Sequence, residues 1–261
     1  MSPVNSNRRN PVTAGFLFIL FILWSLAIIF SWIVHRPFLR NKKYYKSRIA
    51  SHYARWWSLG MLKLLGLKVK VHGSLPSPPF FLVTNHLGYL DIAILASQIP
   101  STFVSKSEVA RWPIFGTLAS FAGTLYVDRK SKRDSLHMGN KIAEHFSSGG
   151  SLTLFPEGTS TAGNEVAPFH SSLLQYPASV CYPVNCAALK YKAPEGFPEA
   201  GQSMAWWGDM AFLPHFWNLF RMRGMQADIA FAVEPVVAGE RKTLAEQLRH
   251  SIQERFEFIR P

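Results

Sequence analysis

Cysteine is nearly absent from this sequence: 261 residues contain only Cys181 and Cys186. Both lie in an apolar, strand-like segment, which predicts two buried and reduced side chains. A zinc site would need further ligands at regular spacing, and the sequence shows none. We therefore expect neither a metal nor a cofactor.

Acidic residues are also scarce, because 16 Asp and Glu stand against 28 Lys and Arg. The resulting net charge of +12 predicts a negatively charged partner, and nucleic acid and anionic lipid both qualify on charge alone. The positive charge concentrates beside the apolar segment described next, so a lipid surface explains it better than DNA does. We expect membrane lipids as partners and no nucleic acid.

Residues 12–34 lack both charge and proline, and 15 of these 23 residues are Leu, Ile, Val or Phe. A helix of this length spans about 35 Å, enough to cross a hydrocarbon core of about 30 Å. A signal peptide would have an apolar region of about 7–15 residues and a small-residue cleavage site. The stretch therefore predicts a retained transmembrane anchor, with a removed signal peptide as the alternative.

Basic residues flank this segment on both sides. Arg8 and Arg9 precede it, and the basic residues that follow it, with no acid among them, are Arg36, Arg40, Lys42, Lys43, Lys46 and Arg48. Basic residues bias their own side of a membrane span toward the cytoplasm and can bind anionic headgroups. We therefore expect a single-pass membrane protein whose catalytic domain lies on the cytoplasmic side.

The chain divides into three parts by composition. Residues 1–40 are expected to form the N-terminal tail and transmembrane anchor. Residues 41–66, rich in aromatic and basic residues, predict a helical segment at the membrane interface; an ordinary helix covering the catalytic core is the alternative. In residues 67–261 short β-rich runs alternate with helical segments, which predicts one α/β domain.

The β-rich runs and helices of this domain can be placed individually. The expected strands are Lys68–Val71, Phe80–Thr84, Thr102–Ser105, Thr124–Val127, Ser151–Phe155, Val180–Leu189 and Asp228–Val237. A helix over residues 132–146 should be closed by Gly149 and Gly150. The last helix is expected to begin at a capping box formed by Thr243 and Glu246. One apolar stripe then follows at four-residue steps: Leu244, Leu248, Ile252 and Phe256.

Two short motifs carry the chemistry. Residues 85–91 read Asn-His-Leu-Gly-Tyr-Leu-Asp, and residues 155–160 read Phe-Pro-Glu-Gly-Thr-Ser; each follows or ends an apolar run. Five residues on a regular helix are about 140° apart. His86 and Asp91 can therefore meet only if His86 lies in the turn after the strand and Asp91 in the first helical turns. The alternative is that Asp91 caps the helix and His86 is a loop residue.

Together these motifs resemble the His-x4-Asp and Glu-Gly-Thr signatures of the glycerolipid acyltransferase family, which includes the lysophosphatidic acid acyltransferases. The resemblance runs from about Val71 to Lys190, and a third family block, glycine, an apolar stretch and arginine, matches residues 123–129. It implies a single α/β acyltransferase domain with a mixed sheet flanked by helices, preceded here by the N-terminal transmembrane helix.

Acyl transfer from a thioester to an alcohol requires removal of the hydroxyl proton as the oxygen attacks. A neutral imidazole, with an ordinary pKa of about 6.5, suits this task, so His86 is the expected general base. Asp91 is expected to accept a hydrogen bond from the other ring nitrogen. The motif holds no serine or cysteine nucleophile, which favours direct transfer.

The resemblance also implies that the Glu-Gly-Thr block helps to form the acceptor site, which assigns Glu157, Gly158 and Thr159 to it. Gly158 would permit close backbone approach to a ligand, and Thr159 offers a hydroxyl. A turn at the sheet edge is the alternative. Arg129 is expected to hold a phosphate, a solvated strand-end arginine being the alternative.

Two positions depart from the family pattern. Many lysophosphatidic acid acyltransferases follow Glu-Gly-Thr with arginine, where this chain has Ser160, and carry lysine where it has His170. Losing two cations weakens the case for a dianionic phosphomonoester acceptor.

We therefore expect a membrane-bound O-acyltransferase. It would move a fatty acyl group from acyl-CoA or acyl-carrier protein to a lyso-glycerolipid such as 1-acyl-sn-glycerol 3-phosphate, in phospholipid biosynthesis. The alternatives are an acyltransferase for another lyso-lipid, either a lysophospholipid or a lyso-aminolipid, and an inactive membrane-bound adaptor with the same fold.

Overall fold

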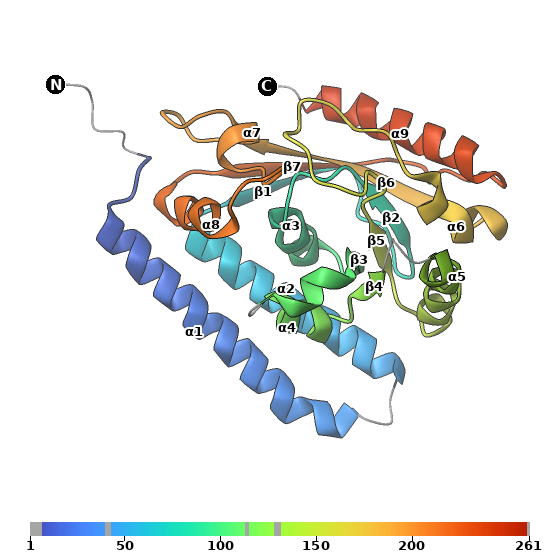
Figure 1. The fold of residues 1–261 in the computed structure, drawn as a ribbon, viewed down its shortest axis with the longest axis horizontal. Helices are drawn as coiled ribbons and strands as arrows, with labels where there is room; N and C mark the ends of the chain where they lie inside the picture. The colour runs from blue at the N-terminus through green and yellow to red at the C-terminus, as the bar shows by residue number, and fades with distance from the viewer. Residues whose placement is uncertain (1–6, 40–42, 113–114, 128–131, 260–261) are drawn as a thin grey trace.

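The computed structural model describes residues 7–39, 43–112, 115–127 and 132–259 (Figure 1). Within them, α-helices (α), short 3₁₀ helices (η) and strands (β) follow one another in chain order. They are α1 (Pro11–His35), η1 (Arg36–Leu39), α2 (Lys43–Leu65), β1 (Lys68–His72), β2 (Phe81–Thr84), α3 (Leu90–Gln98), β3 (Thr102–Lys106), η2 (Ser107–Arg111), α4 (Phe115–Phe121), β4 (Leu125–Val127), α5 (Lys132–Ser147), β5 (Leu152–Leu154), η3 (Ser171–Leu174), α6 (Gln175–Ser179), β6 (Val184–Lys192), α7 (Ala200–Ser203), α8 (Phe212–Arg221), β7 (Gln226–Phe231) and α9 (Arg241–Phe258).

The strands described form one sheet in the order β1-β7-β6-β2-β5-β3-β4. Every neighbouring pair is parallel except β6 and β7, which are antiparallel. The predicted mixed sheet flanked by helices is therefore confirmed. Since β2, β5, β3 and β4 run in the same direction, their carboxyl ends meet at one edge of the sheet, and both sequence motifs begin there.

Each face of the sheet buries its own layer of apolar side chains. Successive residues of a strand point to opposite faces, so Leu82 belongs to one core, whereas Phe81 and Val83 belong to the other. α2, α3 and α8 cover the first face, and α5, α6 and α9 cover the second (Figure 1). The predicted stripe of α9 is buried against the second face.

α1 is the outermost helix and packs against α2, α4 and α8 (Figure 1). One stripe along it is buried: Ala14, Phe21, Ser25, Ile28 and Trp32. The opposite stripe is exposed and apolar: Phe16, Ile19, Leu23, Leu26, Phe30 and Ile33. In the described part of the chain, only this helix is long and apolar enough to cross a membrane. An exposed stripe made only of apolar side chains is unfavourable in water and typical of a surface that contacts a membrane or a partner. α1 therefore indicates membrane association.

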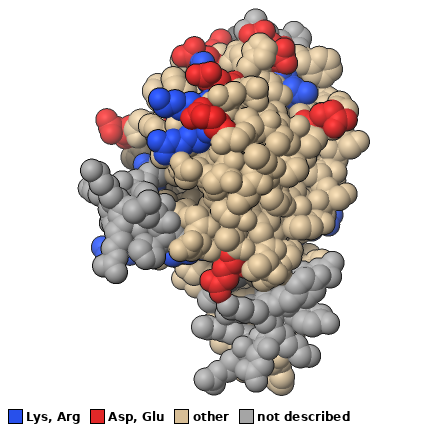
Figure 2. All heavy atoms as spheres, turned by 90° about the vertical axis from the view of Figure 1, so that its right-hand side faces the viewer, with Lys and Arg blue, Asp and Glu red and all other residues tan. Residues whose placement is uncertain are grey.

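α2 lies between α1 and α3, and it buries Tyr53, Trp57 and Met61. One side of α2 therefore packs on the core, whereas Trp56 and Leu59 are exposed, and the expected position at the membrane interface stays a prediction. The charged helix α9 lies on the far side of the sheet from α1 (Figure 1). On the face shown in Figure 2, acidic and basic side chains gather at the level of α9. The charged side and the apolar helix thus lie at opposite ends of the layered structure.

The bounds of β6 and β7 differ most from the predicted strands. β6 begins at Val184 instead of Val180, because residues 180–182 turn out of α6 and Cys181 adopts a left-handed conformation with φ 48°. Cys181 is consequently exposed, which corrects the expectation of two buried cysteines; Cys186 is buried. β7 ends at Phe231, and beyond it only Val236 returns to form an isolated bridge with Val184.

The start of α9 differs from the predicted capping box. Glu240 is the N-cap residue, and its carboxylate accepts hydrogen bonds from the backbone N–H of Thr243 (2.7 Å) and from the Thr243 hydroxyl (3.1 Å). The carboxylate accepts from the third N–H of the helix, and its negative charge is favourable near the positive end of the helix dipole.

Candidate active site

The turn after β2 is held in place by Asn85, whose side chain is buried. Its amide donates to Leu189 O (2.9 Å) and accepts from Leu189 N (2.7 Å), which continues the bonding between β2 and β6 beyond the last paired residues. Gly88 follows with φ 152°, and a Cβ atom there would lie 2.9 Å from the backbone nitrogen of Trp206. Glycine is therefore required where this turn passes the chain before α8.

His86 and Asp91 meet as the motif predicts. His86 Nδ1 lies 2.7 Å from Asp91 Oδ2, with His86 in the turn and Asp91 in the first turn of α3. A carboxylate only accepts hydrogen bonds, so Nδ1 carries the proton and Nε2 presents its lone pair. No described residue hydrogen-bonds Nε2, and the His86 side chain is 22% exposed. The imidazole thus offers a free basic nitrogen on its open side.

Asp91 is completely buried and is surrounded by hydrogen-bond donors. Its Oδ2 accepts from the backbone N–H groups of Leu87 (2.7 Å) and Gly88 (3.0 Å) as well as from His86. Its Oδ1 accepts from the hydroxyl of Tyr191, which β6 supplies. These bonds stabilise a buried negative charge and fix its orientation. Asp91 does not act as an N-cap, because Tyr89 occupies that position without a side-chain bond.

The Glu157 loop lies against the same turn. β5 pairs with β2, and the backbone N–H of Thr161 donates to His86 O (2.9 Å). Glu157 Oε1 accepts from the backbone N–H of His86 (3.3 Å), whereas Oε2 is buried and has no partner among the described residues. Burial, with a smaller contribution from the nearby charge of Asp91, raises the pKa of Glu157 to about 8. Glu157 therefore carries a proton near pH 7 and can donate a hydrogen bond from this position.

For the other predicted site residues, Gly158, Thr159 and Arg129, the structure gives less detail. Gly158 is half-buried, with φ 74°, and Thr159 is exposed on the same loop. Arg129 lies outside the described residues; β4 ends two residues before it, at the sheet edge that carries both motifs.

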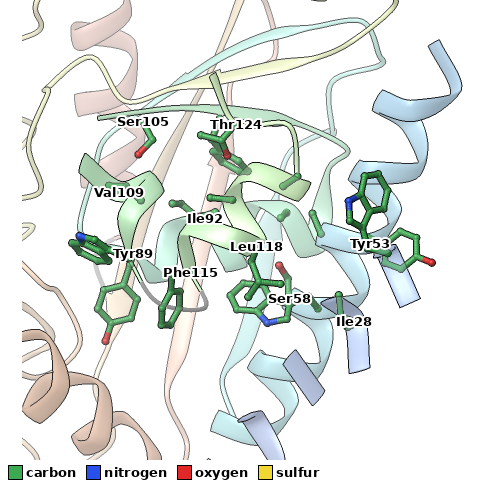
Figure 3. A pocket seen from close by; sticks show the side chains of 18 residues that line it. Ile28, Tyr53, Ser58, Tyr89, Ile92, Ser105, Val109, Phe115, Leu118 and Thr124 are labelled. Carbon is green, nitrogen blue, oxygen red and sulfur yellow. The ribbon is translucent and has the colours of Figure 1, made fainter. Parts of the chain in front are cut away.

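An apolar pocket lies beside the His86 turn, between α1, α2, α3 and α4 (Figure 3). It is narrow, with a free volume of about 100 Å³, and buried rings and aliphatic side chains form most of its wall. Tyr89 lies at one end, and Ile28 and Tyr53 lie at the other (Figure 3). Phe103 lines the pocket and stacks on Phe155, which in turn stacks on His86 at 4.2 Å between ring centroids. The rings of Phe103 and Phe155 therefore lie between the pocket and the imidazole.

Sequence reasoning missed Tyr191 and the pair formed by Tyr89 and His215. The Tyr89 hydroxyl lies 2.7 Å from His215 Nδ1, across 126 positions of sequence. Burial raises the pKa of Tyr89 and lowers the pKa of His215, so both are neutral. Neither motif contains Tyr191 or His215, and no local pattern marks them, because only the fold brings them to the turn.

Comparisons with known proteins agree with this geometry. The model of the acyltransferase family matches residues 68–187. The lyso-ornithine lipid O-acyltransferase of Pseudomonas aeruginosa is 33% identical over 202 residues, which cover 76% of each chain. That of Rhizobium meliloti is 35% identical over 189 residues, 68% of this chain and 64% of the relative, so this chain spans slightly less than two thirds of it.

The fold itself has a solved counterpart. The crystal structure of PlsC, the 1-acyl-sn-glycerophosphate (LPA) acyltransferase of Thermotoga maritima, superposes with a TM-score of 0.62 and 16% identity. The superposition covers 94% of this chain and 99% of PlsC. The resemblance that the two motifs indicate is confirmed: this chain belongs to the acyltransferase family, together with the lyso-ornithine lipid O-acyltransferases.

Proposed function

We propose that this chain is a membrane-bound O-acyltransferase that moves a fatty acyl group from a thioester, acyl-CoA or acyl-carrier protein, to the hydroxyl of a lyso-lipid. The observation that carries the proposal is the bond between His86 Nδ1 and the buried Asp91, which leaves Nε2 without a partner in the described protein. An apolar pocket lies beyond the stacked rings of Phe155 and Phe103, and a basic nitrogen near a hydrocarbon site is the combination that transfer of a fatty acyl group requires.

In the proposed reaction His86 Nε2 takes the proton of the acceptor hydroxyl as its oxygen attacks the thioester carbonyl. The carbon–oxygen bond forms, the carbon–sulfur bond breaks, and the imidazolium returns the proton to the departing thiolate. Asp91 stabilises the imidazolium, and Tyr191 holds the carboxylate in position. The reaction needs no metal or cofactor for this balance.

Glu157, Gly158 and Thr159 are proposed to contact the acceptor. Glu157 Oε1 bonds the turn that carries His86, and Oε2 is buried without a partner in the described protein. An acceptor oxygen that reached the protonated Oε2 would satisfy it. Arg129 is proposed, on the evidence of sequence alone, to contact the phosphate of an acceptor that carries one.

Among lyso-lipids, we propose lyso-ornithine lipid as the acceptor, ahead of 1-acyl-sn-glycerol 3-phosphate. Two lyso-ornithine lipid O-acyltransferases are 33% and 35% identical to this chain. An ornithine head with one acylated amine is zwitterionic, so it needs fewer cations than a phosphomonoester. Ser160 and His170, which replace two cations of many lysophosphatidic acid acyltransferases, support the same choice.

An inactive adaptor is the competing function from another class. A binding role does not require a fully buried Asp91 that accepts hydrogen bonds from His86, Tyr191 and two backbone N–H groups. This arrangement supports the enzyme.

The placement at the membrane is proposed from α1 and its surroundings. The basic residues after α1 support a catalytic domain on the cytoplasmic side. The backbone of Arg9 donates to Arg221 O (2.8 Å), and Arg223 N donates to Asn7 O (2.8 Å), so the start of α1 is bonded to the catalytic domain. A single crossing, as the length of α1 predicts, would place the start of α1 and the catalytic domain on opposite sides of the bilayer. We therefore propose that α1 enters the membrane with both of its flanks on the cytoplasmic side.

Replacing His86 with alanine should lower kcat by about 10²–10⁴-fold, because the general base is lost. Acyl transfer from labelled acyl-CoA to lyso-lipids measures this effect. His250→Ala is the matched control, since that side chain is 78% exposed on α9. A fully active His86→Ala enzyme would reject the mechanism, provided that the protein is still folded and membrane-bound.

Tyr191→Phe removes one hydroxyl and keeps the ring. We expect kcat to fall about 10- to 100-fold, because a hydrogen bond to a charged group is worth about 1.5–3 kcal/mol. KM should not change, because the hydroxyl faces Asp91 and not a substrate. Tyr182→Phe, which removes a hydroxyl bonded to Pro79 O, is the control and should keep its kcat. Equal losses in both variants would contradict a positioning role for Tyr191.

Ser160→Arg should raise the preference for 1-acyl-sn-glycerol 3-phosphate over lyso-ornithine lipid, because a guanidinium binds a phosphomonoester bidentately. Competition between the two acceptors measures the ratio of kcat/KM values, which we expect to change about tenfold for one added charge-assisted contact. Ser179→Arg adds the same charge on α6 and should leave the ratio unchanged. An unaltered ranking in Ser160→Arg would remove Ser160 from the acceptor site.

The orientation can be measured with a thiol reagent that does not cross membranes. A cysteine introduced as Ser6→Cys should react only after the cells are permeabilised. The exposed native Cys181 reports the catalytic domain in the same experiment. Labelling of the introduced cysteine, but not of Cys181, in intact cells would establish the single crossing instead.

A further inference from the structure

A small polar cavity lies at the end of β6, between α7 and the loop that follows Glu157. Its free volume is about 210 Å³. Its walls come from Leu87, residues 162–164, residues 190–191, residues 199–201 and Ala205. The side chains of Asn164 and Glu199 are exposed, so the cavity opens to solvent, unlike the apolar pocket of Figure 3.

Two walls of this cavity belong to residues that adjoin the catalytic pair. Leu87 follows His86 directly in the chain, and its backbone N–H donates to Asp91. Tyr191 lines the cavity and donates its hydroxyl hydrogen to the same carboxylate. A ligand in the cavity would therefore lie beside the turn that presents the candidate general base.

Two glycines bring the walls of the cavity close together. Gly163 has φ 77°, and a Cβ atom on it would lie 2.7 Å from Leu87 Cδ2. A Cβ atom on Gly201 would lie 2.6 Å from Ala162 O. Any other residue at these positions would push the loop away from the turn or from α7. The cavity is thus a defined feature of the packing between these segments.

Glu199 is the only acid among the described residues that line the cavity. It is the N-cap residue of α7, but its side chain forms no cap bond, whereas Glu240 at the same position of α9 accepts from Thr243 N. No other described residue forms a hydrogen bond or an ion pair with the Glu199 carboxylate. This carboxylate is therefore available to a cation.

Hydrogen-bond donors share the walls with Glu199. Asn164 carries an amide, and Lys190 carries an ammonium whose Nζ lies 5.1 Å from the ring centroid of Phe256. A carboxylate beside such donors complements a zwitterion, because the ammonium of the ligand pairs with the acid and its carboxylate with the donors. A phosphomonoester carries only negative charge, and Glu199 would repel it.

Resting on the proposed function, we infer that this cavity holds the polar head of the lyso-lipid acceptor and that Glu199 binds the ammonium group of that head. The head and the reacting hydroxyl of a lyso-lipid belong to one small molecule, so a head beside Leu87 brings the hydroxyl toward His86. Glu199 is then a specificity-determining residue. It favours an aminolipid such as lyso-ornithine lipid over a phosphomonoester and takes no part in the proton transfer.

Glu199→Gln tests this assignment, because it removes the charge and keeps the shape of the side chain. The full chain in phosphatidylcholine vesicles would be assayed with three acceptors: lyso-ornithine lipid, the same lipid with its free amine acetylated, and 1-acyl-sn-glycerol 3-phosphate. Glu195→Gln is the matched control. It makes the same change at an exposed carboxylate in the same segment, outside the cavity.

Glu199→Gln should raise KM for lyso-ornithine lipid about three- to tenfold, since an exposed carboxylate forms a weaker ion pair than a buried one. Its kcat should not change, because Glu199 does not touch the reacting atoms. For the acetylated lipid, which has no ammonium, kcat/KM should equal that of the wild type, which also shows that the variant is folded. For 1-acyl-sn-glycerol 3-phosphate, kcat/KM should not fall. Glu195→Gln should change none of these values.

Equal losses with the free and the acetylated amine would overturn the role of Glu199, as would an equal loss in Glu195→Gln. Turnover of 1-acyl-sn-glycerol 3-phosphate alone by the wild type would overturn the ammonium site and leave the acyltransferase activity standing. A wild-type enzyme that acylates none of the three lipids would instead overturn the proposed function, so the two failures are distinguishable.

Discussion

The buried carboxylate of Asp91 is the interaction on which the site depends. A charge that is completely removed from water requires hydrogen-bond donors, and here they come from the turn after β2 and from β6. Satisfying Asp91 therefore fixes three elements at once: the turn that holds His86, the start of α3, and the register of β6 against β2. Asn85, which bonds Leu189 two residues before Tyr191, strengthens the same junction. The orientation of the His86 imidazole is therefore fixed because the buried Asp91 needs it as a hydrogen-bond donor.

The layers around this junction separate water from hydrocarbon. α9, with its charged outer face, covers one side of the sheet. α2, α3 and α8 cover the other side and lie between the sheet and α1 (Figure 1). His86 lies where the carboxyl ends of the parallel strands meet the layer formed by α2, α3 and α8. In the proposed reaction a soluble thioester would approach from the sheet edge, and the hydrocarbon chains would remain among the helices. This separation would keep water from the chains while the carrier stays in water.

The sequence was informative where a local pattern has a physical cause. The apolar run of β2 followed by Asn85 and Gly88 requires a strand and a turn, and the structure places His86 and Asp91 within hydrogen-bonding distance as the motif spacing predicts. The stripe from Leu244 to Phe256 is buried as predicted, because helical periodicity is visible within one segment. Errors arose at element ends. Val180 to Tyr182 are compatible with a strand by composition, yet the turn that leaves α6 determines their conformation.

Contacts between distant segments could not be predicted in the same way. Tyr191 reaches Asp91 across 100 positions, and its position in β6 becomes meaningful only once β6 is known to lie beside β2. The pocket of Figure 3 is similar in this respect, since side chains from α1, α2, α3 and α4 form its wall together.

Burial also determines the charge of Glu157, the second carboxyl group near His86. Two ionised carboxyl groups beside one imidazole would repel each other and any anionic acceptor. Because burial raises the pKa of Glu157 to about 8, this carboxyl remains neutral near pH 7 and the negative charge of the site is confined to Asp91. In the proposed reaction one carboxyl group orients the base while the other can donate a hydrogen bond, although their side chains have the same chemistry. The fold thus distinguishes the two groups by surroundings alone: donors surround Asp91, whereas one oxygen of Glu157 is buried without a partner in the described protein.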